Sequence, residues 1–116
     1  MINGAHAIVF ATDPEAGRAF FRDVLGLRSV DAGGSWLIFA LPPAELAIHP
    51  TEGKARHELY FMCDDIAATV AELEGRGVDI VHPVSDEGFG LMTRVRVPGA
   101  GEIGIYEPRH PSPLSA

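Results

Sequence analysis

Two side chains with metal-binding or acid–base chemistry lie at matching places in the two halves of the sequence. His6 lies seven residues before Asp13, and Glu58 lies seven residues before Asp65. Imidazole and carboxylate groups both bind divalent metals, and burial in a cleft raises the pKa of a carboxyl toward values that suit a general base. His6 and Glu58 are therefore candidate metal ligands, and Glu58 is a candidate general base. The structural alternative is a hydrogen-bonded histidine and a solvated carboxylate at two strand ends.

Each candidate opens a stretch that predicts a strand followed by a capped helix. Asp13 followed by Pro14, and the pair Asp64 and Asp65, are typical signals for the first turn of a helix. Apolar residues alternate before these caps and follow a helical period after them. The predicted elements are a strand over 5–11, a helix from 14 to the glycine at 26, a strand over 57–63, and a helix from 66 to the glycines at 75 and 77.

Three further strands follow each helix, so the order β-α-β-β-β occurs twice. The closing segments 45–50 and 102–108 have similar sequences, which aligns Ala47 with Gly104. Two copies of a unit of about 50 residues are too few for a solenoid, so we expect the two halves to pair into one closed or partly closed sheet structure. The additional strands are predicted over 27–32, 35–41 and 44–49, and over 78–84, 91–97 and 102–107.

Composition narrows the classes of function. The formal net charge is -7 and the chain has one lysine, so a nucleic-acid partner is disfavoured. A single cysteine, Cys63, excludes an intramolecular disulfide, and no apolar run is long enough to span a membrane, so we expect a cytoplasmic protein with no membrane partner. Residues 109–116 are rich in proline and serine and are predicted to be a surface tail or a loosely docked arm without chemistry.

The pattern resembles a known superfamily. The resemblance is carried most specifically by residues 6–13, 20–26, 64–65 and 101–108, and it covers residues 5–108. It points to the vicinal oxygen chelate superfamily, which includes glyoxalase I, extradiol dioxygenases and bleomycin-resistance proteins. The resemblance implies a single α+β domain over 1–108, in which modules 3–50 and 56–108 form a curled mixed sheet around a cleft, and it also implies a homodimer.

Metal-dependent members of that superfamily place their ligands on the first and last strands of each module. By resemblance, those four positions are His6, Ala47, Glu58 and Gly104 in this sequence. Alanine and glycine have no side-chain donor, whereas a catalytic zinc takes about three protein ligands. Half of the expected metal site is missing, and the two small residues suit the close approach of a flat ligand.

The remaining cleft residues predict an apolar, aromatic pocket. Arg94 could pair with an acidic group on the ligand. Glu45 and Glu102 are expected to be solvated strand-end charges, and Trp36 and Phe89 to be ordinary core residues. Together with His6, Ala47, Glu58 and Gly104, the predicted ligand-binding residues are Ile8, Phe10, His49, Tyr60, Met62, Met92, Arg94 and Tyr106.

Three functions remain open at this point. The first is a protein that sequesters or senses a hydrophobic or aromatic molecule and has no metal cofactor. The second is a glyoxalase-like lyase or isomerase, or a dioxygenase, that holds iron, manganese, nickel or zinc through His6 and Glu58. The third is an interaction module that uses a sheet edge and has no small ligand.

Overall fold

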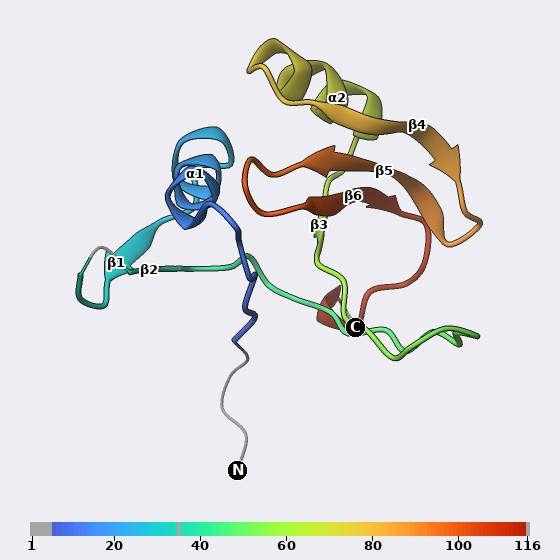
Figure 1. The fold of residues 1–116 in the computed structure, drawn as a ribbon. Coiled ribbons are helices and arrows are strands. Elements are labelled where there is room, and N and C mark those ends of the chain that lie inside the picture. The colour runs from blue at the N-terminus through green and yellow to red at the C-terminus, as the bar shows by residue number, and fades with distance from the viewer. Residues whose placement is uncertain (1–5, 35, 116) are drawn as a thin grey trace.

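The structure is a computed structural model and describes residues 6–34 and 36–115. It is an α+β domain in which a four-stranded sheet and a two-stranded sheet lie beside two helices (Figure 1). None of the described helices is long and apolar enough to cross a membrane. In chain order, the elements are α1 (Pro14–Ala19), the π-helical turn η1 (Phe20–Val24), β1 (Ser29–Asp31), β2 (Leu37–Phe39), β3 (Tyr60–Met62), α2 (Ile66–Gly75), β4 (Ile80–Asp86), β5 (Gly90–Arg96), β6 (Glu102–Pro108) and the short 3-10 helix η2 (Pro113–Ser115).

The C-terminal half forms the complete sheet, with strand order β3-β6-β5-β4. β3 runs parallel to β6, and the other two pairs are antiparallel. Helix α2 lies across one face of the sheet (Figure 1). Asp65 caps its N-terminus, because the Asp65 carboxylate accepts a hydrogen bond from the Ala68 amide. The core lies on the helix side of the sheet, where alternate side chains of β5 and β6 are buried: Thr93, Val95, Ile103 and Ile105.

The N-terminal half contributes a helix and a short hairpin to the same core. The Asp13 carboxylate caps α1 by accepting from the Ala16 amide, and Pro14 occupies the first turn, as predicted. Phe20 and Phe21 are buried against the strands of the second half. The turn between β1 and β2 contains Gly33, whose φ of 118° favours glycine. This half therefore docks through its helix rather than through a shared sheet.

Two predicted strands are wrong for the chain as the structure has it. Residues 6–11 and 44–49 have no strand pairing, whereas residue 5 lies outside the described residues. A strand needs a neighbour to satisfy its amides and carbonyls and to cover its apolar side chains, and neither segment has one here. The apolar side chains of these segments are exposed, most of all Phe10, Leu46 and Ile48 at 90%, 87% and 85%. The two sheets therefore do not close around a cleft.

Smaller differences affect the remaining elements. The strands predicted over 27–32, 35–41 and 57–63 are shortened to three residues each, whereas those over 91–97 and 102–107 are confirmed within a residue. Trp36 is not a core residue, because it is 70% exposed and the Arg18 guanidinium lies 5.8 Å from its ring. Without a closed N-terminal sheet, no layer is available to bury the indole.

Candidate functional site

Strand pairing places three of the predicted site residues side by side on the open face of the four-stranded sheet. Gly104 of β6 pairs with Tyr60 of β3 on one side and with Arg94 of β5 on the other. Their neighbours in sequence, including Val95 and Ile105, point to the opposite face and are buried in the core. The open face of β3, β6 and β5 is therefore the surface on which a ligand could bind.

Arg94 is the centre of a charged group on this face, which we call the Arg94 cluster: Arg94, Glu58, Tyr60 and Glu102. The Arg94 Nε donates to Glu102 Oε1 at 3.1 Å, and Nη1 lies 3.5 Å from Glu58 Oε2. The Tyr60 hydroxyl donates to Glu58 Oε1 at 3.2 Å, and the guanidinium lies 5.7 Å from the centre of the tyrosine ring. The Arg94 side chain is 21% exposed, and its guanidinium is shared by two carboxylates.

The Arg94 cluster shifts the pKa of Tyr60. Burial raises the pKa of Tyr60, and the negative charge of Glu58 raises it further, whereas the nearby Arg94 lowers it. The net shift is upward, so the hydroxyl keeps its proton and acts as a donor to Glu58.

Gly104 has a packing role that the sequence does not reveal. A Cβ atom at this position would lie 2.0 Å from Cδ1 and 2.3 Å from Cε1 of Tyr60, so only glycine allows the ring to lie flat against β6. We expected Gly104 to leave room for a ligand. In the structure, the Tyr60 ring occupies the space directly above it.

A second polar group, which we call the Glu45 cluster, consists of Glu45, Tyr106, His110 and Ser112. It joins the N-terminal half to residues 109–115, which we call the arm. The Glu45 carboxylate accepts hydrogen bonds from the Ser112 hydroxyl and, at 3.5 Å, from the Tyr106 hydroxyl. His110 Nε2 lies 3.4 Å from the Tyr106 hydroxyl and 4.0 Å from Glu45 Oε1. The Glu45 side chain is 12% exposed, so the prediction of a solvated charge is wrong.

Tyr106 connects the two clusters through its ring. Its centre lies 5.9 Å from that of Tyr60 and 6.2 Å from that of Phe89, both in edge-to-face geometry. Phe89 in turn lies 5.7 Å from the ring of His49. Burial raises the pKa of Tyr106, and the charge of Glu45 adds to this shift, so this hydroxyl also stays a donor.

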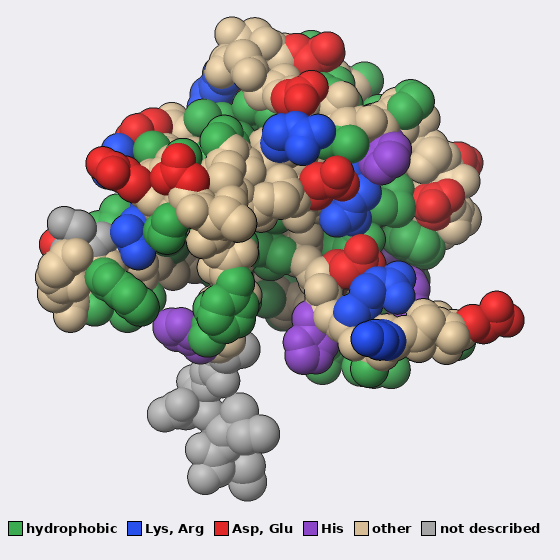
Figure 2. Space-filling model, viewed as in Figure 1, with side chains coloured by type: hydrophobic (Ala, Val, Ile, Leu, Met, Phe, Trp, Pro, Cys, Tyr) green, Lys and Arg blue, Asp and Glu red, His purple; other side chains and the backbone are tan. Residues whose placement is uncertain are grey.

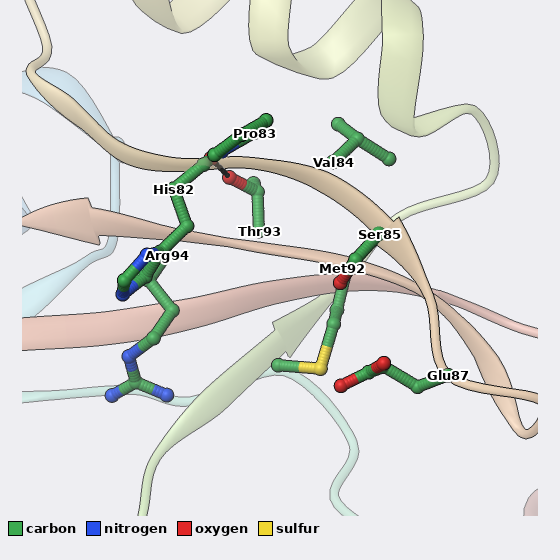
Figure 3. Close-up of a pocket in the computed structure, with 8 residues that line it drawn as sticks. All are labelled: His82, Pro83, Val84, Ser85, Glu87, Met92, Thr93 and Arg94. Atoms are coloured by element: carbon green, nitrogen blue, oxygen red, sulfur yellow. Dashed lines mark hydrogen bonds between the residues drawn. The ribbon is translucent and has the colours of Figure 1, made fainter.

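A hollow of about 360 Å³ adjoins the Arg94 cluster between β4 and β5 (Figure 3). It forms where the pairing of the two strands shifts register on both sides of His82, which spreads the backbones. Met92 and Glu87 lie at one end of the hollow, and Arg94 and His82 lie at the other. Met92 and Arg94 are predicted site residues, whereas His82 and Glu87 are not, because the irregular pairing of β4 hides the alternation that would have aligned them.

Charge is mixed rather than gathered in one patch on the side of the molecule that Figure 2 shows. Figure 2 shows acidic and basic side chains interspersed, with hydrophobic side chains between them. Pairs such as Arg96 with Asp79 and Arg109 with Asp86 join opposite charges at 3.1 and 3.3 Å. On the side that Figure 2 shows, the described residues form no basic stripe of the kind that a nucleic-acid backbone requires.

Comparison with known families identifies the superfamily. The sequence profile of the Glyoxalase/Bleomycin resistance protein/Dioxygenase superfamily matches residues 4–109. The chain belongs to this superfamily. The resemblance found in the sequence is confirmed, and so is the fold class.

Solved structures of other superfamily members share the fold. The chain is similar to TnmS3, an antibiotic binding protein from Streptomyces sp. CB03234, with 24% identity, 93% of this chain and 99% of that chain covered, and a TM-score of 0.63. It is also similar to a lactoylglutathione lyase from Agrobacterium tumefaciens (19% identity, 90% and 96% covered, TM-score 0.60) and to a superfamily member from Sphaerobacter thermophilus DSM 20745 (20% identity, 91% and 98% covered, TM-score 0.66). No curated protein matches the sequence. Likeness at this level of identity establishes the fold alone.

The residues of this member do not fit the metal that metal-dependent relatives hold. Among residues 6–34 and 36–115, no three His, Cys, Asp or Glu side chains converge on one point. Ala47 and Gly104 have no donor, and Glu58 is already paired with Arg94 and Tyr60. A divalent cation at Glu58 would also be repelled by the guanidinium beside it.

The structure gathers some of the predicted ligand-binding residues and leaves others apart. Tyr60, Met92, Arg94, Gly104 and Tyr106 share the open face with Glu58, and Met62 pairs in register with Tyr106. His49 reaches this group through Phe89. His6, Ile8, Phe10 and Ala47 are exposed on the unpaired segments of the N-terminal half.

His110 and Ser112 are not among the predicted site residues. They lie in a stretch predicted to be a surface tail or a loosely docked arm without chemistry, and their contact with Glu45 spans more than 60 residues of chain. No local pattern could have revealed it.

Proposed function

We propose that this protein binds a hydrophobic, aromatic small molecule against the open face of β3, β6 and β5 and does so without a catalytic metal. The observation that carries the proposal is that Arg94 occupies the Glu58 carboxylate while the Tyr60 ring fills the space at Gly104. Both second-module positions that would hold a metal are therefore engaged by the protein's own side chains. Binding, for sequestration or sensing, is the activity that this arrangement supports best.

The walls of the site suit an apolar ring system. Met62, Met92 and Tyr106 lie in adjacent register on the open face, and thioether and ring surfaces adapt to flat ligands. The adjoining hollow of about 360 Å³ is within the usual size range of small-molecule sites. One structural neighbour, TnmS3, is described as an antibiotic binding protein, which shows that this fold serves ligand binding in a relative.

The NMR signals of the methionine methyl groups give a direct test. The chain contains three methionines, and two of them, Met62 and Met92, lie on the proposed face. A panel of aromatic natural products is first screened by thermal shift, and each stabilising compound is then added to protein labelled at the methionine methyls. We expect the signals of Met62 and Met92 to move together. Stabilising compounds that leave both signals in place contradict the proposal.

The competing function is a metal-dependent lyase, isomerase or dioxygenase. A neighbour from Agrobacterium tumefaciens is described as a lactoylglutathione lyase, and Glu58 stands at a ligand position of the superfamily. The protein is incubated with manganese, iron, nickel or zinc, desalted and assayed for bound metal, with a His6→Ala/Glu58→Ala double variant as control. Stoichiometric retention by the wild type alone would establish the metal-dependent reading. Equal, low retention by both proteins supports metal-free binding.

We further propose that two copies of the chain associate. Ile8, Phe10, Leu46 and Ile48 are between 67% and 90% exposed on segments without strand partners, and such apolar segments favour association. A second copy would cover them and complete the wall of the site on the N-terminal side. Sedimentation velocity should give a dimer for the wild type and a monomer for a Phe10→Asp/Ile48→Asp variant. A monomeric wild type at high concentration would refute this part.

A cytoplasmic location stays a prediction from the single cysteine.

A further inference from the structure

The Glu45 carboxylate is a charged group in a largely covered place. Its side chain is 12% exposed, and a covered carboxylate needs hydrogen-bond donors to offset the loss of water. The structure provides three groups around it: the hydroxyls of Ser112 and Tyr106 and the ring of His110. Two of these three groups come from the arm.

The arm itself is held loosely. Its Pro111 and Leu114 are exposed. The described contacts that anchor it beyond Arg109 are the polar ones of the Glu45 cluster and a single ring contact, in which the centre of the His110 ring lies 6.1 Å from that of Tyr106. Net stabilisation from such partly exposed hydrogen bonds is small. At its base, the amide of Arg109 donates to the Phe89 carbonyl at 2.8 Å, and the Arg109 side chain pairs with Asp86. A change that begins at His110 would therefore release the arm without opening the sheet.

Without the arm, Glu45 would keep only the long hydrogen bond from Tyr106. The carboxylate would then present free acceptor positions beside the rings of Tyr106 and Phe89, on the face already proposed to bind the ligand. An acceptor carboxylate next to aromatic rings favours a ligand that carries an ammonium group on an aromatic body. The net charge of -7 also attracts cations toward the protein.

We propose that Glu45 and Tyr106 bind the ammonium group of the aromatic ligand, and that the arm occupies this position through Ser112 and His110 until the ligand displaces it. This inference rests on the proposed function and specifies the chemical class of its ligand. The Ser112 hydroxyl takes the place of the ligand's donor in the unliganded protein.

Trypsin cleavage after Arg109 measures release of the arm in the full chain. Cleavage after Lys54, in the exposed connector, is the internal reference, because an effect on the protease itself changes both rates. Proteolysis follows the population of the open form when opening is fast. We expect Ser112→Ala to raise the Arg109/Lys54 cleavage ratio by a factor of roughly three to ten, as expected for one lost hydrogen bond. An unchanged ratio overturns the proposal.

The ligand class is tested with two probes of similar size, 2-phenylethylammonium and 3-phenylpropionate. The ammonium probe should raise the cleavage ratio in the wild type and in a Glu52→Gln control, whose glutamate is exposed, but not in Glu45→Gln. The carboxylate probe should leave the ratio unchanged in all three proteins. No response to the ammonium probe, or a response that survives in Glu45→Gln, overturns the inference.

A third probe separates failure of this inference from failure of the proposed function. Ethylbenzene has the aromatic body without the charge. If it moves the methyl signals of Met62 and Met92 while the ammonium probe leaves the cleavage ratio unchanged, the open face binds aromatic molecules and only the role of Glu45 is wrong. If neither probe has an effect, both proposals fail.

Discussion

Ile48 and Ile105 occupy matching places in the two halves of the chain, one residue after Ala47 and Gly104. Ile48 is 85% exposed, whereas Ile105 is 3% exposed. The difference lies in their neighbours: Ile105 belongs to β6, which is paired on both sides and covered by the core, and residues 44–49 pair with no strand. Similar residues in a similar order are therefore buried only where a partner strand and a covering layer are present.

The contrast extends to function. The C-terminal half holds a fixed cluster around Arg94 on a complete sheet, whereas the N-terminal half contributes Glu45 from a segment held by the arm. A rigid sheet can position a ligand, and a loosely held segment can respond to one. Four measurements test this division, beginning with the largest expected effect.

Truncation of the matching isoleucines should separate the halves most clearly. Ile105→Ala removes buried methyl groups and is expected to lower the free energy of unfolding by about 2–5 kcal/mol. Ile48→Ala should change that of the monomeric chain by about 0.5 kcal/mol or less. Chemical denaturation at low protein concentration measures both. A large loss of unfolding free energy for Ile48→Ala would mean that residues 44–49 are covered within one chain. The two halves would then not differ in the way described above.

The second matched pair, Ala47 and Gly104, tests the fit between Gly104 and the Tyr60 ring. Gly104→Ala places a methyl group against the tyrosine ring and is expected to cost about 1–3 kcal/mol of unfolding free energy. Ala47→Gly, at the matching exposed position, should cost about 0.5 kcal/mol or less. Adding Tyr60→Ala to Gly104→Ala should make the glycine substitution nearly neutral in a double-mutant cycle. Additive losses would show that the ring does not lie on Gly104.

Removal of the Arg94 charge, at the centre of the open face, should have a smaller effect on stability. Arg94→Met leaves Glu58 and Glu102 without their shared cation, and we expect a loss of about 1 kcal/mol because these groups are partly exposed. Arg96→Met is the control on the same strand, since its pair with Asp79 is 55% and 68% exposed and should contribute about 0.5 kcal/mol or less. Equal losses for the two variants would argue against a special role for Arg94.

The smallest expected effect is a shift in the pH at which the two tyrosines titrate. Both tyrosines lie in the C-terminal half, and burial raises the pKa of each above 10.0, with Glu58 adding to the shift at Tyr60 and Glu45 at Tyr106. Because the folded pKa values are higher than the unfolded ones, their contribution to stability is complete below pH 10 and is lost as the pH rises through the folded values. Phenolate absorbance should therefore appear at higher pH in the folded than in the urea-unfolded protein, and Glu58→Gln should reduce the gap.

The sequence alone determined where the two helices begin, the strands β5 and β6, and the superfamily. Asp13 with Pro14, and Asp65, fix helix starts through contacts within a few residues, so local chemistry is enough to locate them. The alternation in 91–97 and 102–107 predicted strands that the structure confirms, because these strands pair with near neighbours along the chain. The empty donor positions at Ala47 and Gly104 could also be read directly.

Only the tertiary structure decided what surrounds those positions. The pairing of Arg94 with Glu58, the Tyr60 ring on Gly104, and the contact between Glu45 and Ser112 join residues 36, 44 and 67 apart along the chain. The same holds for the exposed segments 6–11 and 44–49, whose pattern predicts strands but whose partners are missing. Local patterns specify what a segment can form, and long-range contacts decide whether a partner is there to stabilise it.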